Sequence, residues 1–138
     1  MLRKNTRALP FILHIDDNEI DRLILERGLK KQDKSLEIKS FCDAESAETY
    51  LASICKSGAG IPDLIVTDNS MPVKTGFDLV EFIKTFDILG NVPIVMLSSS
   101  TLEKDMEKAY SLGVNSFISK PVNPQALNQI IGFLANKD

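Results

Sequence analysis

Short apolar runs alternate with stretches of helical periodicity along the chain, and this alternation constrains the fold more than any other feature. The apolar runs are FILHI (11–15), LEIKSF (36–41), DLIVT (63–67), PIVML (93–97) and NSFIS (115–119). The helical stretches that follow them cover residues 19–31, 44–56, 76–86, 101–112 and 124–136. Strands that alternate with helices are typical of βαβ units, in which the strands are parallel. The sequence therefore predicts an α/β fold of five such units.

The composition of the individual strands predicts where each one lies in the sheet. Residues 63–67 and 93–97 are almost entirely apolar, as expected of strands with helices on both faces, whereas residues 36–41 alternate and suit an edge. Short connections and right-handed crossovers favour a doubly wound, flavodoxin-like sheet of order 2-1-3-4-5, with helices on both faces. In that order the first and third strands meet at the point where the winding direction changes.

The length of 138 residues fits one ordinary domain. We expect residues 1–8 to form a short N-terminal tail and residues 9–138 to form a single domain, because no linker or low-complexity segment interrupts the alternation.

Composition argues against several classes of partner. The 16 basic and 19 acidic side chains give a net charge of −3, and the lysines are scattered, so direct binding to nucleic acid is not expected. No run approaches the roughly 20 apolar residues of a membrane span, and the N-terminus lacks a secretory signal. Cys42 and Cys55 do not have the spacing of a metal or redox motif. We therefore expect a soluble, cytoplasmic protein with two reduced thiols and no contact with a membrane.

Several helix starts have the sequence of a cap. Ser100 and Glu103 have the spacing of a capping box, Asp43 is placed to cap the second helix, and Asn123 precedes Pro124 at the start of the last one. These residues predict where three of the helices begin.

Polar residues stand where four of the apolar runs end. Asp16 and Asp17 follow the first run, Asp68 follows the third, Ser98 follows the fourth and Lys120 follows the fifth. Each residue taken singly is typical of a solvated turn or a helix cap. In a parallel sheet, however, the carboxyl ends of the strands share one edge. Their joint placement predicts one acidic pocket that also contains a lysine and a serine.

Such a pocket has the groups that phosphoryl transfer to a carboxylate requires. Carboxylates within about 4 Å of one another repel by roughly 4 kcal/mol per pair at an effective dielectric constant near 20. A hard cation such as Mg²⁺ relieves this repulsion and prefers oxygen ligands. Asp68 ends the central strand before an open loop, so it is the candidate nucleophile toward phosphorus. Lys120 and Ser98 are candidates to bind phosphoryl oxygens.

Two residues near these positions have an ordinary structural interpretation. His14 lies within the first strand and is expected to be a core histidine with satisfied hydrogen bonds. Phe117 lies in the last strand, where packing in the core is its simplest role.

Four segments together resemble the receiver domain of bacterial two-component response regulators, in particular the stand-alone chemotaxis type. They are IDDN (15–18), LIVTDNSMP (64–72), PIVMLSSS (93–100) and SFISKP (116–121). The resemblance covers about residues 9–136. It implies a phosphoprotein of a phosphorelay, in which a sensor histidine kinase or a histidine phosphotransfer protein donates the phosphoryl group. It also implies Mg²⁺ as cofactor, for which Mn²⁺ can substitute.

The same resemblance implies a role for each residue of the pocket. Asp68 matches the phosphoacceptor and Lys120 the lysine that pairs with the phosphoryl group. Asp17 matches a direct metal ligand, Asp16 an acid that holds the metal largely through water, and Ser70 the residue whose backbone carbonyl binds the metal.

The resemblance further implies a switch that leads away from the pocket. Ser98 matches the hydroxyl residue that moves to the phosphoryl group, and Phe117 the aromatic residue that swings inward with it, where the family often has Thr and Tyr. The Lys120-Pro121 peptide bond is implied to be cis. A downstream protein is expected to read the surface formed by roughly residues 101–136, and the protein is expected to be a monomer or a weak, phosphorylation-dependent dimer. Such a switch takes part in its own phosphorylation and dephosphorylation but is not an enzyme toward outside substrates.

Three other functions use a similar sheet. An aspartate-nucleophile phosphatase of the haloacid dehalogenase type needs a second acid two residues after the nucleophile, and that position is Ser70. A flavodoxin-like cofactor binder needs a phosphate loop rich in hydrogen-bond donors after the first strand, where this chain is acidic. A non-phosphorylated pseudo-receiver that acts only as an interaction module is the remaining alternative, and the intact Asp17, Asp68 and Lys120 argue against it.

Overall fold

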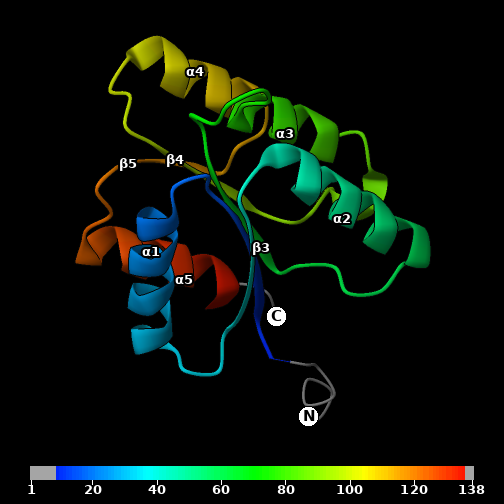
Figure 1. The fold of residues 1–138 in the computed structure, drawn as a ribbon, viewed down its shortest axis with the longest axis horizontal. Coiled ribbons are helices and arrows are strands. Elements are labelled where there is room, and N and C mark those ends of the chain that lie inside the picture. Colours follow the sequence, from blue (N-terminus) through cyan, green and yellow to red (C-terminus); the bar gives the residue numbers. More distant parts are fainter. Residues whose placement is uncertain (1–8, 136–138) are drawn as a thin grey trace.

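The computed structural model describes residues 9–135, which form five strands that alternate with five α-helices (Figure 1). The strands are β1 (Phe11–Ile15), β2 (Glu37–Phe41), β3 (Leu64–Asp68), β4 (Ile94–Ser98) and β5 (Ser116–Ser119). The helices are α1 (Glu19–Gln32), α2 (Ala44–Ser57), α3 (Gly76–Ile83), α4 (Glu103–Ser111) and α5 (Pro124–Ala135), with a short 3-10 helix η2 (Asp87–Leu89) between α3 and β4. Within residues 9–135 no helix is both long enough and apolar enough to span a bilayer.

All five strands are parallel and lie in the order β2-β1-β3-β4-β5. The predicted order is therefore confirmed, and β2 is an edge strand as its alternating sequence indicated. The register pairs Ile15 of β1 with Thr67 of β3, and Asp68 with Leu97 of β4. This register brings the carboxyl ends of β1, β3 and β4 to one edge of the sheet.

Helices cover both faces of the sheet, with α1 and α5 on one side and α2, α3 and α4 on the other (Figure 1). Because side chains alternate along a strand, neighbouring residues enter different cores. Leu13 and Ile15 pack with α2 and α3, whereas Ile12 packs with α1 and α5. Every residue of β3 and of β4 is buried. The sheet is therefore held firmly on both faces at the strands that end in Asp68 and Ser98.

Two of the predicted caps are confirmed, and each explains where a helix begins. The carboxylate of Asp43 accepts a hydrogen bond from the amide of Ser46 at 2.7 Å, at the start of α2. The side-chain oxygen of Asn123 accepts one from the amide of Ala126 at 2.8 Å, at the start of α5. In each case a short polar side chain satisfies an amide that has no partner within its helix.

The predicted capping box of Ser100 and Glu103 is wrong, and α4 begins at Glu103 rather than at 101. The N-cap residue is Leu102, which makes no side-chain capping bond. The hydroxyl of Ser100 is already used, because it accepts from the Leu102 amide at 3.1 Å and donates to the Asp105 carboxylate at 2.7 Å. The first helical turn therefore forms two residues later than the spacing predicted.

The single helix predicted over residues 76–86 is also wrong, because α3 ends at Ile83. Beyond it, the amides of Thr85 and Phe86 bond three residues back, to Phe82 and Ile83, at 3.1 Å each. Bonds over three residues tighten the backbone into 3-10 geometry, which continues into η2.

His14 is fully buried in β1, but only one of its ring nitrogens has a partner among the described residues. Nδ1 lies 3.1 Å from Oε2 of Glu26 on α1, whereas Nε2 has no hydrogen-bond partner there. Burial acts to raise the pKa of Glu26, but the hydrogen bond and charge of His14 outweigh it, so the pKa of Glu26 lies below its ordinary value. The expectation of a fully satisfied core histidine is therefore only half correct.

Candidate functional site

Three carboxylates from two neighbouring strands converge at the carboxyl edge of the sheet. Asp16 and Asp17 follow β1, Asp68 ends β3, and one oxygen from each lies within 4.8 Å of the others. Asp16 and Asp68 are almost completely buried, at 1% and 3% exposure, whereas Asp17 is exposed. The predicted acidic pocket is present, and it opens to solvent on the side of Asp17.

Lys120 lies at the centre of this cluster, although it is the first residue after β5. Its ammonium nitrogen is 3.0 Å from Oδ1 of Asp68, 3.2 Å from Oδ2 of Asp16 and 3.0 Å from Oδ2 of Asp21. The Lys120-Pro121 peptide bond that follows is cis, as the resemblance implied. The lysine therefore contacts one member of the strand-end acid pair, an acid on α1 and the candidate nucleophile.

Backbone contacts fix the loop that follows Asp68. The Asn69 amide donates to the carbonyl of Leu97 at 2.9 Å, and the Gly76 amide donates to the carbonyl of Asn69 at 2.9 Å. A Cβ atom at Gly76 would lie 2.9 Å from the Cα of Asn69 and would clash with the carbonyl oxygen of Asp68. Only glycine lets the start of α3 approach the end of β3 this closely.

The acid pair is also fixed by its neighbours. One carboxylate oxygen of Asp16 accepts from the Asn18 amide at 2.9 Å, and the Asp16 amide donates to the Phe41 carbonyl of β2 at 3.1 Å. The guanidinium of Arg22 donates to the Asp16 carbonyl oxygen at 2.7 Å. These contacts hold Asp16 between β2 and the first turns of α1.

The electrostatics of the cluster follow from burial and crowding. Burial raises the pKa of Asp68 above its ordinary value of 3.8, and the charges of Asp16 and Asp17 act in the same direction, against the hydrogen bond of Lys120. Burial acts to lower the pKa of Lys120, but the bonds to Asp21 and Asp68 outweigh it and raise this pKa above its ordinary value. Asp68 is therefore an ionisable group whose charge the fold stabilises incompletely.

The donor set suits a hard divalent cation. Carboxylate oxygens from Asp16, Asp17 and Asp68 are the ligands that Mg²⁺ and Mn²⁺ accept, and the exposed position of Asp17 leaves room for water. The side-chain oxygen of Asn69, the residue after Asp68, is buried without a hydrogen-bond partner among the described residues. Ser70 follows on the same loop and is exposed, and its role as a carbonyl ligand stays a prediction.

Ser98 and Phe117 occupy the expected positions on the two adjacent strands β4 and β5. The hydroxyl of Ser98 is buried and accepts from the Ser100 amide at 3.0 Å. Phe117 is half-buried, and its backbone amide donates to the hydroxyl of Tyr110 on α4 at 3.1 Å. Through Ser100, which donates to Asp105, and through Tyr110, the contacts extend from the ends of β4 and β5 to α4.

A cavity of about 410 Å³ adjoins the cluster between α1 and the loop that joins β5 to α5. Its polar wall includes Asp16, Asp21 and Lys120, and Ile24 contributes to its apolar wall. Ile24 belongs to an exposed apolar group on α1 with Ile20 and Leu23. A partner that reaches Asp68 from this side would therefore meet an apolar rim.

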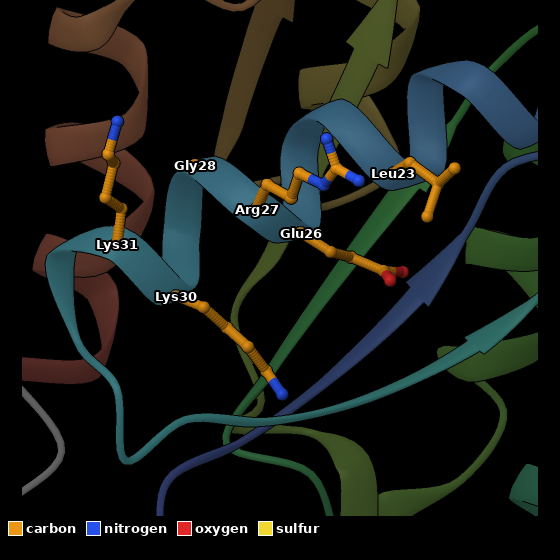
Figure 2. A pocket seen from close by; sticks show the side chains of 6 residues that line it. All are labelled: Leu23, Glu26, Arg27, Gly28, Lys30 and Lys31. Atoms are coloured by element: carbon orange, nitrogen blue, oxygen red, sulfur yellow. The ribbon is translucent and has the colours of Figure 1, made fainter.

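A larger hollow of about 590 Å³ lies farther along α1 (Figure 2). It is lined by Leu23, Glu26, Arg27, Gly28, Lys30 and Lys31. None of the converging carboxylates lines it, and the Glu26 side chain points toward the strands (Figure 2). There Oε2 of Glu26 lies 3.1 Å from Nδ1 of His14. We therefore assign the chemistry to the acidic cluster and not to this hollow.

Sequence reasoning missed three residues of the site, namely Asp21, Arg22 and Asn69. Asp21 stands in the first turn of the helix predicted to begin directly after the Asp16-Asp17 pair, so its place in the sequence was a usable signal. Nothing in the sequence indicated the bond from Arg22 to a main-chain oxygen or the buried amide oxygen of Asn69.

Comparison with known proteins agrees with the geometry. Residues 12–132 match the family model of the response regulator receiver domain. A two-component response regulator of Arabidopsis thaliana, ARR17, is 32% identical over 137 residues, which cover 91% of this chain and 84% of the relative. The phosphorylated cyanobacterial phytochrome response regulator RcpA superposes with a TM-score of 0.80 at 29% identity, covering 95% of this chain and 97% of RcpA. The Mn²⁺-bound response regulator Rcp1 gives a TM-score of 0.76 at 26% identity, covering 92% and 93% of the two chains.

Proposed function

This chain belongs to the response regulator receiver domain family, and on that premise we propose that Asp68 accepts a phosphoryl group from a phosphohistidine. As a receiver domain it is a component of two-component phosphorelay signalling, and a non-phosphorylated pseudo-receiver is not favoured. The observation that carries the proposal is the contact of Lys120 with Asp68 at 3.0 Å inside a cluster of three converging carboxylates. A module used only for protein contacts has no need of such a cluster.

Asp16, Asp17 and Asp68 would hold Mg²⁺, or Mn²⁺ in its place, with the Ser70 carbonyl as a further ligand. When bound, the cation neutralises the crowded carboxylates and the charge of the incoming phosphoryl group. The chain itself orients the nucleophile, because β3 is buried along its length and the Asn69 loop is fixed by backbone bonds. Rigid positioning of this kind is the main contribution a protein makes to phosphoryl transfer.

The transfer step exchanges one bond to phosphorus for another. A carboxylate oxygen of Asp68 attacks the phosphorus, and the bond between phosphorus and the imidazole nitrogen of the donor breaks. The electron pair of that bond stays on the imidazole, which leaves neutral after taking up a proton. Lys120, which contacts Asp68, and the buried Ser98 hydroxyl would donate hydrogen bonds to the phosphoryl oxygens.

The phosphohistidine donor, a sensor histidine kinase or a histidine phosphotransfer protein, is proposed to dock on α1 beside the cluster. Its phosphorus must come within bonding reach of Asp68, so its surface must cover the rim of the site. Ile24 lines the cavity beside the cluster, and Ile20 lies one helical turn before it on α1; the two side chains are 62% and 66% exposed. Exposed apolar groups of this kind beside a polar site are typical of a docking surface.

Phosphorylation is proposed to change the surface formed by roughly residues 101–136, where a downstream protein binds. The support is the chain of contacts from Ser98 to Ser100, and from Ser100 to Asp105 of α4, at 3.0 and 2.7 Å. Phe117 is joined to the same helix through Tyr110. We propose a monomer, or a weak dimer formed on phosphorylation, that acts in the cytoplasm and takes part in its own phosphorylation and dephosphorylation.

The decisive experiment is intact-mass measurement after incubation with acetyl phosphate and Mg²⁺. We expect one added phosphoryl group on the wild type and none on Asp68→Asn. Omission of Mg²⁺ is expected to abolish the addition to the wild type. Equal modification of both proteins would place the acceptor elsewhere. Sustained release of phosphate from an aryl phosphate would instead favour a phosphatase.

A further inference from the structure

We infer that Asp21, on the first turn of α1, is a positioning residue that anchors the ammonium group of Lys120 during phosphoryl transfer. This inference rests on the proposed function. Oδ2 of Asp21 lies 3.0 Å from Nζ of Lys120, the same distance as Oδ1 of Asp68. Asp21 stands outside the three carboxylates that converge on a candidate metal position. The contact between Asp21 and Lys120 therefore indicates a role other than binding the metal.

The hydrogen-bond donors of Lys120 explain why a further carboxylate matters. An ammonium group has three N–H donors, and three carboxylates lie within 3.2 Å of Nζ. Asp68 loses its negative charge when one of its oxygens becomes bonded to phosphorus. Asp16 shares its charge with any cation held by the cluster. Asp21 is then the one of the three whose full charge still faces Lys120.

The fold fixes Asp21 independently of the strands that carry the other two acids. Asn18, the N-cap of α1, accepts a hydrogen bond from the Asp21 amide at 2.9 Å. The Lys120 side chain is only 18% exposed, whereas the Asp21 side chain is 42% exposed. Asp21 therefore holds Lys120 from the solvent side, while Asp16 and Asp68 contact it from the sheet edge.

This arrangement lets the contact of Lys120 with Asp68 change while its contact with Asp21 is kept. When a phosphoryl oxygen replaces the Asp68 oxygen as acceptor, the bond to Asp21 keeps the ammonium group over the site. Without it, the flexible four-carbon side chain has more positions available, and fewer of them are productive. Because solvent screens a half-exposed ion pair, we expect its loss to slow phosphorylation by about fivefold.

The test measures the rate constant of phosphorylation at saturating Mg²⁺ and saturating acetyl phosphate, on the full chain. Asp21→Ala and Asp21→Asn are expected to be slower by about fivefold. Asp21→Glu restores the charge and should recover most of the rate. The matched control is Glu19→Gln, which removes one negative charge from the same exposed turn of α1 but from a residue that does not contact Lys120. Its rate should equal that of the wild type.

A second measurement separates positioning of the lysine from an effect on the metal. Because Asp21 lies outside the metal cluster, the Mg²⁺ dissociation constant of Asp21→Asn should stay within about twofold of the wild-type value. An Asp21→Ala rate equal to or faster than wild type, or a Glu19→Gln rate as slow as Asp21→Asn, would overturn the role of Asp21. So would a loss of Mg²⁺ affinity that accounts for the slower rate. An unphosphorylated wild type would remove the proposed function itself, so the two failures are distinguishable.

Discussion

Oδ1 of Asp68 forms an ion pair with Nζ of Lys120 at 3.0 Å, and this contact joins the end of the central strand to the loop after β5. Asp68 is buried, and its other near neighbours are the carboxylates of Asp16 and Asp17. The single lysine therefore offsets only part of the charge that β1 and β3 bring together. The consequences of this imbalance for stability can be measured without any phosphodonor.

Replacing Asp68 by Asn should stabilise the metal-free protein at pH 7. The pKa of Asp68 is raised in the folded state, so the fold binds its proton more tightly than the unfolded chain does. Ionisation of Asp68 therefore removes stability as the pH rises from the ordinary value of 3.8 through the folded-state pKa. We expect Asp68→Asn to raise Tm by about 3 °C at pH 7, as for a change of about 1 kcal/mol.

Thermal unfolding in the presence of a chelator checks this prediction. The difference between Asp68→Asn and the wild type should shrink as the pH falls below the ordinary pKa, because Asp68 is then neutral in both states. Lys120 keeps Asp16 and Asp21 as partners in the variant, so loss of its third contact should not cancel the gain. A variant less stable than the wild type at pH 7 would show that the lysine already compensates the buried charge.

Mg²⁺ should raise the thermal stability of the protein, and a chelator should reverse the effect. A ligand that binds only the folded state at 100 times its dissociation constant contributes about 2.7 kcal/mol. Asp17→Asn should lose most of this gain, because Asp17 is the exposed member of the carboxylate cluster. Glu81→Gln, an equal change of charge on the exposed surface of α3, should keep it. A gain shared by both variants would indicate nonspecific screening by the salt.

Gly76→Ala should destabilise the fold and slow phosphorylation together. The added Cβ would clash with the main-chain oxygen of Asp68 and lie 2.9 Å from the Cα of Asn69. Because backbone atoms cannot move aside as a flexible side chain can, we expect a cost of about 1–3 kcal/mol. Urea unfolding measures the cost, and phosphorylation by acetyl phosphate measures the displacement of the nucleophile. Gly132→Ala is the control, because a Cβ there meets no atom of residues 9–135 within 4 Å.

Ile24→Ser should slow phosphoryl transfer from a phosphohistidine protein but not from acetyl phosphate. Ile24 is 62% exposed and lines the cavity beside Asp21 and Lys120, so a docking protein would cover it, whereas a small donor would not. Burial of such a side chain contributes roughly 1.5–3 kcal/mol, so we expect a loss of about tenfold or more in the second-order rate constant. Ile88→Ser, at a 45% exposed position in η2, is the matched control. Equal slowing with both donors would place Ile24 in the chemistry instead of the docking surface.

The amino-acid sequence by itself determined the α/β class, the strand order and the identity of the converging residues. This was possible because strand periodicity and burial are local properties, and because parallel strands must share an edge at their carboxyl ends. It did not determine where α3 ends or where α4 begins. Those limits depend on competition for hydrogen bonds, as when the Ser100 hydroxyl bonds Asp105 instead of capping the helix at 101.

Only the tertiary structure decided how charge is shared inside the site. The sequence matched Lys120 to a lysine that binds phosphate. It did not indicate the third carboxylate that contacts this lysine, Asp21, because no local sequence pattern encodes the distance between the first turn of α1 and the loop after β5. The same origin explains the fit of Gly76 against Asp68 and the Asn69 amide oxygen, which has no partner among the described residues. Contacts of this kind depend on the angle and distance between packed elements. They are fixed by the whole core and not by the residues that make them.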